Sequence, residues 1–137
     1  MDGELSTNGL VVAYVDDEPA PRLVAQRLLQ VAGYRALTGA SGEEAIALRF
    51  GDPEPDAMVV NGLMPGMHGD RAIAAIRARE AAEGRRRVPI ILESAWEDVA
   101  ERAERCGADG FLWAGWRRED LFESLEALLA RGRGDDL

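Results

Sequence analysis

The amino-acid sequence predicts a single α/β domain in which a five-stranded parallel sheet lies between two layers of helices. Short apolar runs alternate with amphipathic stretches five times, as expected for repeated strand–helix units. The apolar runs contain no polar alternation, so both faces of the sheet are expected to be covered. The chain has 137 residues, which is too short for a second domain with a core of its own.

The elements follow one another from residue 10 to residue 131, after a loose lead-in at residues 1–9. The expected strands are residues 10–15, 34–38, 57–60, 88–92 and 110–113. The expected helices are residues 19–33, 41–50, 69–83, 95–106 and 117–131. Residues 132–137 are expected to form a short acidic tail.

Local residue choices support these bounds. Pro19 suits the first turn of the first helix, and Gly33 suits the position just after its end. Ser41 and Glu44 form the capping-box pattern that opens the second helix. Three consecutive arginines at residues 85–87 predict a solvated turn.

Composition narrows the class of function. The chain has 25 acidic and 16 basic residues and a formal charge of −9, which argues against direct nucleic-acid binding. All the basic residues are arginine. Cys106 is the single cysteine, so no internal disulfide can form and a cytoplasmic location is expected. No apolar run is long enough to span a membrane, and the first residues lack the pattern of a signal peptide.

Four stretches resemble the receiver domain of bacterial two-component response regulators, in the family's order and at its element boundaries. They are residues 11–17, 58–69, 89–95 and 107–112. The resemblance implies a flavodoxin-like sheet with strand order 2-1-3-4-5, and a site at the carboxyl ends of the strands. It also implies that an aspartate after the third strand accepts a phosphoryl group from a histidine kinase.

The resemblance assigns each pocket position a role. Asp16 and Asp17 match the acidic pair that holds Mg²⁺, and Ser94 matches the hydroxyl that binds the phosphoryl group. Asn61 stands at the acceptor position, where a carboxamide is a poor nucleophile for phosphorus. Ala114 stands at the position of the phosphate-binding lysine. The pocket therefore predicts a degenerate receiver that requires no cofactor and binds Mg²⁺ weakly.

The retained residues also have simpler interpretations. Asp16 and Asp17 could form a strand-to-helix turn without binding metal, and Ser94 could be the N-cap of a helix starting near residue 95. Glu93 lies in a strand position that is usually apolar, so it is either a buried carboxylate or a sign that the strand ends early.

Aromatic residues surround the predicted pocket. Trp113 is expected to fill the space left by the missing lysine. Trp96 and Trp116 are candidates for partner contact, and for Trp116 exposure and inward packing stay open. Phe111 stands where receivers carry a switch aromatic, and it can pack inward without donating a hydrogen bond.

These observations favour a phosphorylation-independent, non-enzymatic interaction module in signal transduction. Its expected partner is another protein or a second copy of this chain, bound through the fourth helix, fifth strand and fifth helix. The alternative is a phosphoacceptor receiver of a histidine-kinase phosphorelay, in which residue 61 is an altered aspartate. A nucleotide- or flavin-binding domain is disfavoured because the glycine-rich phosphate-binding motifs are absent.

Overall fold

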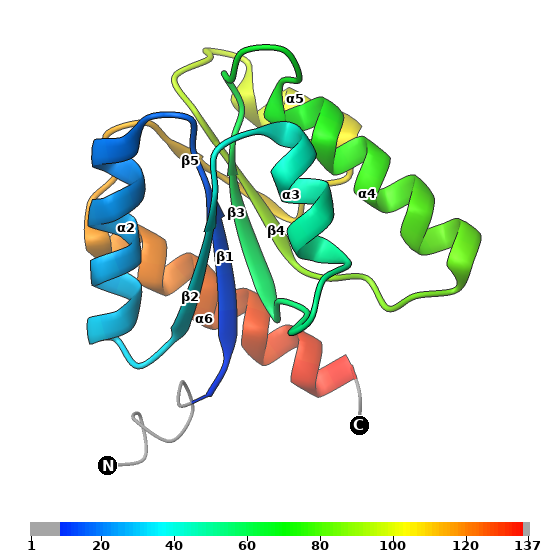
Figure 1. Ribbon diagram of the computed structural model, residues 1–137, viewed down its shortest axis with the longest axis horizontal. Coiled ribbons are helices and arrows are strands. Elements are labelled where there is room, and N and C mark those ends of the chain that lie inside the picture. The colour runs from blue at the N-terminus through cyan, green and yellow to red at the C-terminus, as the bar shows by residue number, and fades with distance from the viewer. Residues whose placement is uncertain (1–8, 136–137) are drawn as a thin grey trace.

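The structure is a computed structural model in which residues 9–135 are described, so all but the last residue of the lead-in expected at residues 1–9 lies outside the described residues (Figure 1). The strands are β1 Val11–Val15, β2 Arg35–Gly39, β3 Ala57–Asn61, β4 Ile90–Ser94 and β5 Gly110–Trp113. The helices are α2 Pro19–Val31, α3 Gly42–Arg49, α4 Gly69–Glu83, α5 Val99–Cys106 and α6 Arg118–Asp135. All ten elements were predicted, and most ends agree within two residues.

Three ends differ for identifiable reasons. β4 begins at Ile90, because Pro89 has no N–H for a ladder and the Val88 N–H donates to a side chain of α4. α5 begins at Val99 rather than near residue 95, because residues 95–98 form a turn. α6 continues to Asp135, beyond the expected end at residue 131, and residues 136–137 lie outside the described part.

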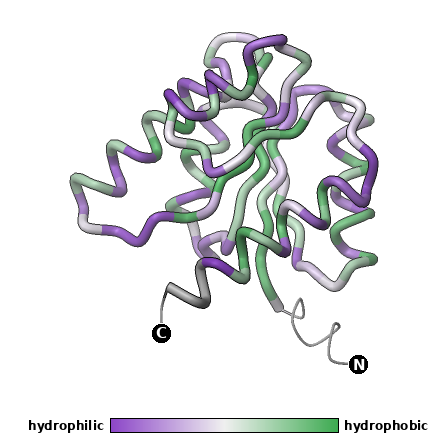
Figure 2. The backbone as a smooth tube through the Cα atoms, turned by 180° about the vertical axis from the view of Figure 1, so that it is seen from behind, coloured by the Kyte–Doolittle hydropathy of each residue, from purple (hydrophilic) through white to green (hydrophobic). Residues whose placement is uncertain are grey.

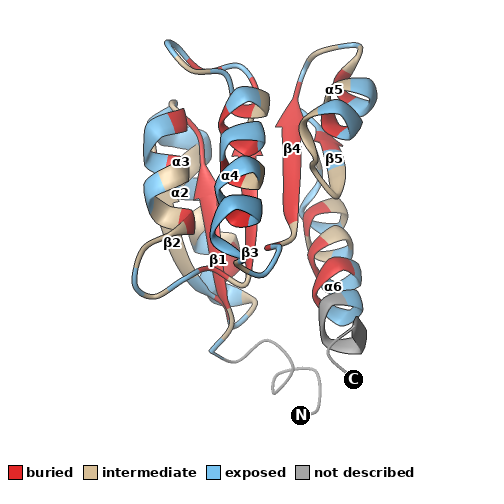
Figure 3. Cartoon of the chain, turned by 90° about the vertical axis from the view of Figure 1, so that its right-hand side faces the viewer, coloured by how far each residue is buried: buried red, intermediate tan, exposed pale blue. Residues whose placement is uncertain are grey.

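The five strands are all parallel and lie in the order β2-β1-β3-β4-β5, as the resemblance implied. One core cluster packs the sheet against α3, α4 and α5, and the other packs it against α2 and α6. Figures 2 and 3 show the hydrophobic, buried strands at the centre and exposed residues on the outer helix surfaces. Among the described residues, no helix combines the length and apolar character needed to cross a membrane.

Strand register brings the candidate residues to one edge of the sheet. Val15 pairs with Val60, Asn61 pairs with Glu93, and Ser94 pairs with Trp113. Because the strands are parallel, the residues that end or follow β1, β3, β4 and β5 all meet at the carboxyl edge.

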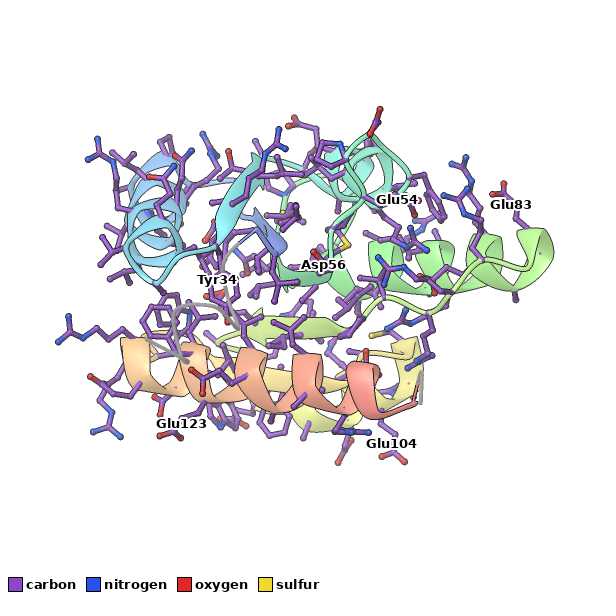
Figure 4. The ribbon with its side chains drawn as sticks, turned by 90° about the horizontal axis from the view of Figure 1, so that it is seen from below. Tyr34, Glu54, Asp56, Glu83, Glu104 and Glu123 are labelled. Carbon is purple, nitrogen blue, oxygen red and sulfur yellow. The ribbon has the colours of Figure 1, made fainter. Side chains whose placement is uncertain are left out.

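The opposite edge is closed by a buried ionic network. The Arg49 side chain is fully buried at the end of α3, and its guanidinium donates to Glu80 of α4 and to Glu54, each at 2.7 Å. Arg77 pairs with Glu80 at 2.8 Å and with Asp109 at 2.8 Å. Figure 4 shows Glu54 near side chains that carry nitrogen atoms.

The arginines at residues 85–87 lie on a loop with Arg86 and Arg87 exposed, as the predicted solvated turn requires, and they also extend this network. Arg85 pairs with Glu54, and Arg87 pairs with Asp109, each at 3.0 Å. Arg86 donates to the backbone oxygen of Pro55 at 3.0 Å. The run therefore connects the loop after α4 to both neighbouring loops.

Candidate functional site

A side-chain amide joins the ends of β1 and β3 at the carboxyl edge. Asp16 is 3% exposed, and its Oδ1 accepts hydrogen bonds from Asn61 Nδ2 at 3.1 Å and from the Glu18 backbone N–H at 3.0 Å. Asn61 Oδ1 accepts from the Leu63 backbone N–H at 3.2 Å. Both the oxygen and the nitrogen of the carboxamide are thus hydrogen-bonded. Its N–H₂ group donates to the Asp16 carboxylate, whose charge a metal ion would otherwise neutralise.

This arrangement is a poor fit for Mg²⁺. The hard cation prefers charged oxygen ligands, whereas Asp16 Oδ1 already accepts two hydrogen bonds and residue 61 is uncharged. Asp17 follows Asp16 and is half-buried. Among the side chains described from residue 9 to residue 131, no group of three or more His, Cys, Asp or Glu is arranged to hold a metal.

Restoring the acceptor carboxylate should change both metal affinity and stability. Asn61→Asp is expected to tighten Mg²⁺ binding by about tenfold, because a third carboxylate then faces the cation. Without Mg²⁺, the same variant should lose about 1 kcal/mol in free energy of unfolding, because repulsion from Asp16 replaces a hydrogen bond. Titration calorimetry and urea unfolding with and without Mg²⁺ measure both effects. Equal Mg²⁺ affinity in the two proteins would show that Asp16 and Asp17 are not arranged as a metal site.

Ser94 ends β4 and does not cap α5. Its side chain is almost completely buried, and its Oγ accepts a hydrogen bond from the Trp96 backbone N–H at 3.1 Å. The N-cap residue of α5 is Asp98, so the proposed capping role of Ser94 was wrong. The hydroxyl instead holds the turn that carries Trp96 over the acceptor loop.

Ala114 lies at the same edge but brings no charge. Its backbone N–H donates to the Ser94 backbone oxygen at 3.0 Å, and its side chain is exposed. The next cations along the chain belong to Arg117 and Arg118, which pair with Asp120 and a neighbouring glutamate. The loop after β5 therefore holds a methyl group where the resemblance implied a phosphate-binding ammonium.

Glu93 is a buried carboxylate within β4, so the strand does not end before it. It is 7% exposed and lies beside Asn61 in the strand register. Burial and, after it, the nearby Asp16 charge raise the pKa of Glu93 to about 7, although a hydrogen bond from the Trp116 indole opposes both effects. Burial, followed by the charges of Glu93 and Asp16, also raises the pKa of the Tyr14 hydroxyl.

Trp116, rather than Trp113, packs into the space at this edge. Its ring meets Tyr14 edge to face, with centroids 6.4 Å apart, and it packs against the core beneath α2 and α6. Trp113 is 50% exposed and Phe111 is 39% exposed, and the two rings form an edge-to-face pair with centroids 6.0 Å apart. The expectation that Trp113 fills the pocket was therefore wrong, and Phe111 packs outward.

Trp96 covers the acceptor loop. Its indole contacts the His68 ring, with centroids 5.5 Å apart, and the Arg102 guanidinium lies 4.1 Å from its ring centroid. A Cβ atom on Gly62 would lie 2.5 Å from the Trp96 ring. A Cβ on Gly69 would collide with the Asn61 backbone oxygen, so the loop closes tightly only with glycine at both positions.

Comparisons with known proteins agree with this architecture. The family model of the response regulator receiver domain matches residues 12–126. The positive alginate biosynthesis regulatory protein of Pseudomonas aeruginosa is 36% identical over 118 residues, which cover 84% of this chain and 45% of that protein. Response regulator MprA of Mycolicibacterium vanbaalenii is 32% identical over 127 residues, covering 91% of this chain and 52% of that protein. The chain thus spans about half the length of these curated relatives.

Solved structures show the same likeness over the whole domain. Chemotaxis protein CheY4 of Vibrio cholerae superposes with a TM-score of 0.77 at 26% identity, covering 88% of this chain and 98% of that chain. A LuxR-family two-component response regulator from an Aurantimonas species superposes with a TM-score of 0.77 at 27% identity, covering 90% of this chain and 86% of that chain.

Proposed function

Because the chain belongs to the response regulator receiver family of two-component signalling, we propose that it is a receiver that works without an aspartyl phosphate. In this proposal the domain is a non-enzymatic interaction module that needs no cofactor. Its signal is the presence of the folded domain and its contact with a protein partner, rather than the charge of a phosphoryl group.

The observation that carries the proposal is the hydrogen bond from Asn61 to Asp16. Phosphoryl transfer needs an anionic oxygen to attack phosphorus, and a carboxamide supplies none. Phosphoryl transfer also needs positive charge around the transferred phosphoryl group. In this pocket Asp16 accepts a hydrogen bond from the uncharged Asn61 amide, and Ala114 supplies no cation. Two independent requirements of the chemistry are missing from one pocket, which is why the phosphorelay alternative is less well supported.

The contact surface in this proposal is formed by α5, β5 and α6. The exposed Phe111–Trp113 pair supplies an apolar centre, and charged residues of both signs surround it. Figure 4 shows Glu104 and Glu123 projecting outward from this side of the molecule. An apolar centre with a charged rim suits pairing with another protein or with a second copy of this chain through a twofold axis.

The remaining attributes of the proposal rest on composition and length. The net charge of −9 is unfavourable for direct contact with nucleic acid, and the absence of a disulfide pair suits the cytoplasm. The chain covers only about half of its curated relatives.

Phosphodonor treatment tests the proposal directly. The protein incubated with acetyl phosphate and Mg²⁺ is expected to show no mass gain, because Asn61 offers no nucleophilic carboxylate. Intact-mass spectrometry gives the readout. Covalent addition of one phosphoryl group to residue 61 or to a neighbouring residue would overturn the proposal and restore the phosphorelay alternative.

Two variants serve as controls for the same experiment. Asn61→Asp should gain a phosphoryl group, which shows that the donor and the fold are competent. Asn61→Asp combined with Ala114→Lys should hold that group longer, because an ammonium then contacts the phosphoryl oxygens. Position 114 is exposed, so the added side chain has room.

A further inference from the structure

A groove lies between α2 and α6 at the carboxyl edge of the sheet. Its volume is about 640 Å³, which is within the range of small-molecule sites. One wall is apolar and is formed by α2 and by the loops after β3 and β5. The residues of this apolar wall include Ala20, Pro21, Val24, Leu28, Leu63 and Trp116.

The floor and rim of the groove are acidic. Three lining residues are carboxylates, namely Asp16, Glu18 and Glu93. One lining residue is a cation, Arg118, which is largely exposed and pairs with Glu119 at 3.3 Å. Among the side chains that the structure describes, up to residue 131, neither Asp16 nor Glu93 forms an ion pair, although both are more than nine-tenths buried. Asp16 accepts hydrogen bonds from Asn61 and from the Glu18 backbone N–H, and Glu93 accepts one from Trp116, but these donors are uncharged.

We infer that this groove binds a small organic cation, with its ammonium group facing Asp16 and Glu93 and its apolar body lying against α2. The charge of the occupant follows from the buried carboxylates, because a cation is the group that they stabilise most in a site shielded from water. The occupant is expected to have an apolar body because it would lie against the apolar side chains of α2, of which Val24 is more than half exposed.

The same geometry favours an ammonium group over a metal ion. A hard metal ion needs several oxygen ligands in a closed shell, and Asp16 Oδ1 already accepts two hydrogen bonds. An ammonium group needs only a few acceptor oxygens and also gains from contact with an aromatic face. Trp116 lies in the groove wall and donates its indole N–H to Glu93, so the carboxylate is held in place before a ligand arrives.

Three probes of matched size separate charge from apolar contact. Phenethylamine, phenethyl alcohol and phenylacetate are titrated at about pH 8 into ¹⁵N-labelled protein, and NMR shifts are followed at the Trp116 indole and the α2 amides. The amine is expected to bind in the millimolar range, as is usual for a ligand of this size, and to shift these signals. The alcohol should bind about tenfold more weakly, and the anion should not bind.

Variants locate the site. Glu93→Gln should weaken amine binding about fivefold, whereas the exposed Glu126→Gln on α6 should leave it unchanged. Val24→Thr should weaken the amine and the alcohol alike, because it removes apolar wall without touching the acids. Equal binding of amine and alcohol, or no shift of the groove signals with the amine, would overturn the inference.

The inference goes beyond the proposed function and can fail separately from it. A wild-type chain that accepts phosphate and also binds the amine would overturn the proposed function and leave the cation site standing. A chain that gains no phosphoryl group and does not bind the amine would leave the proposed function standing and overturn the cation site.

Discussion

Replacing Glu93 with glutamine is expected to raise the free energy of unfolding by about 3 kcal/mol at pH 8 and by less than about 1 kcal/mol at pH 5. Burial and the Asp16 charge raise the pKa of Glu93 from 4.5 to about 7 in the folded protein. The folded state therefore holds this proton more tightly than the unfolded state does. Stability falls as pH rises from about 4.5 to about 7, and the full penalty is present above that window.

Glutamine removes the ionisation and keeps the shape, so the Trp116 indole retains an acceptor. Urea unfolding of both proteins at the two pH values measures the difference, and the exposed Glu126→Gln serves as the matched control. A gain that is equal at both pH values would mean that Glu93 is already ionised at pH 5. A loss at both would mean that its carboxylate has a cationic partner.

Arg49→Met is expected to lower the free energy of unfolding by about 3 kcal/mol. The Arg49 side chain is 0% exposed, and it donates to Glu80 and Glu54 and to the Arg86 backbone oxygen at 2.8 Å. Methionine has a similar shape but leaves the almost buried Glu80 with one arginine instead of two. A buried charge that loses a partner bears most of its desolvation cost alone.

The control is Arg105→Ala on α5, where the arginine is largely exposed and lies 4.0 Å from Asp98. This exposed pair should contribute much less to the free energy of unfolding than the buried network, because solvent and salt screen it. Chemical denaturation of the two variants and the parent provides the comparison. Similar small losses in both variants would show that the Arg49 network contributes no more than surface charge.

The order of elements and the meeting of the candidate residues at one edge of the sheet could be predicted from the sequence, because both follow from local patterns. Apolar runs without alternation predicted buried parallel strands, and polar residues after those runs predicted the functional edge. The unusual position of Glu93 was visible as a carboxylate within an apolar run. Its burial depended on what packs over it, namely Trp116 from a loop more than twenty residues away.

The predictions that failed depended on long-range packing. Trp113 and Trp116 have similar sequence surroundings, but strand pleating turns Trp113 outward beside Phe111, whereas the following turn brings Trp116 over Tyr14. Ser94 followed by a polar stretch resembles an N-cap, but the chain makes a further turn before α5 begins. The arginines at residues 85–87 form the predicted solvated turn, but their acidic partners lie on loops that are distant in sequence and are not visible in the charge run.

The strand end at Asn61 also bears on how this protein ages. An asparagine followed by glycine is the dipeptide most prone to deamidate, through attack of the glycine nitrogen on the side-chain carbonyl carbon. Here the Gly62 N–H donates to the Glu93 backbone oxygen at 2.7 Å, and Asn61 Oδ1 accepts from Leu63. Ring closure would require this edge of the sheet to open first. The folded chain therefore resists spontaneous conversion of its amide to the carboxylate that other receivers carry, and long storage should not recreate an acceptor that the gene does not encode.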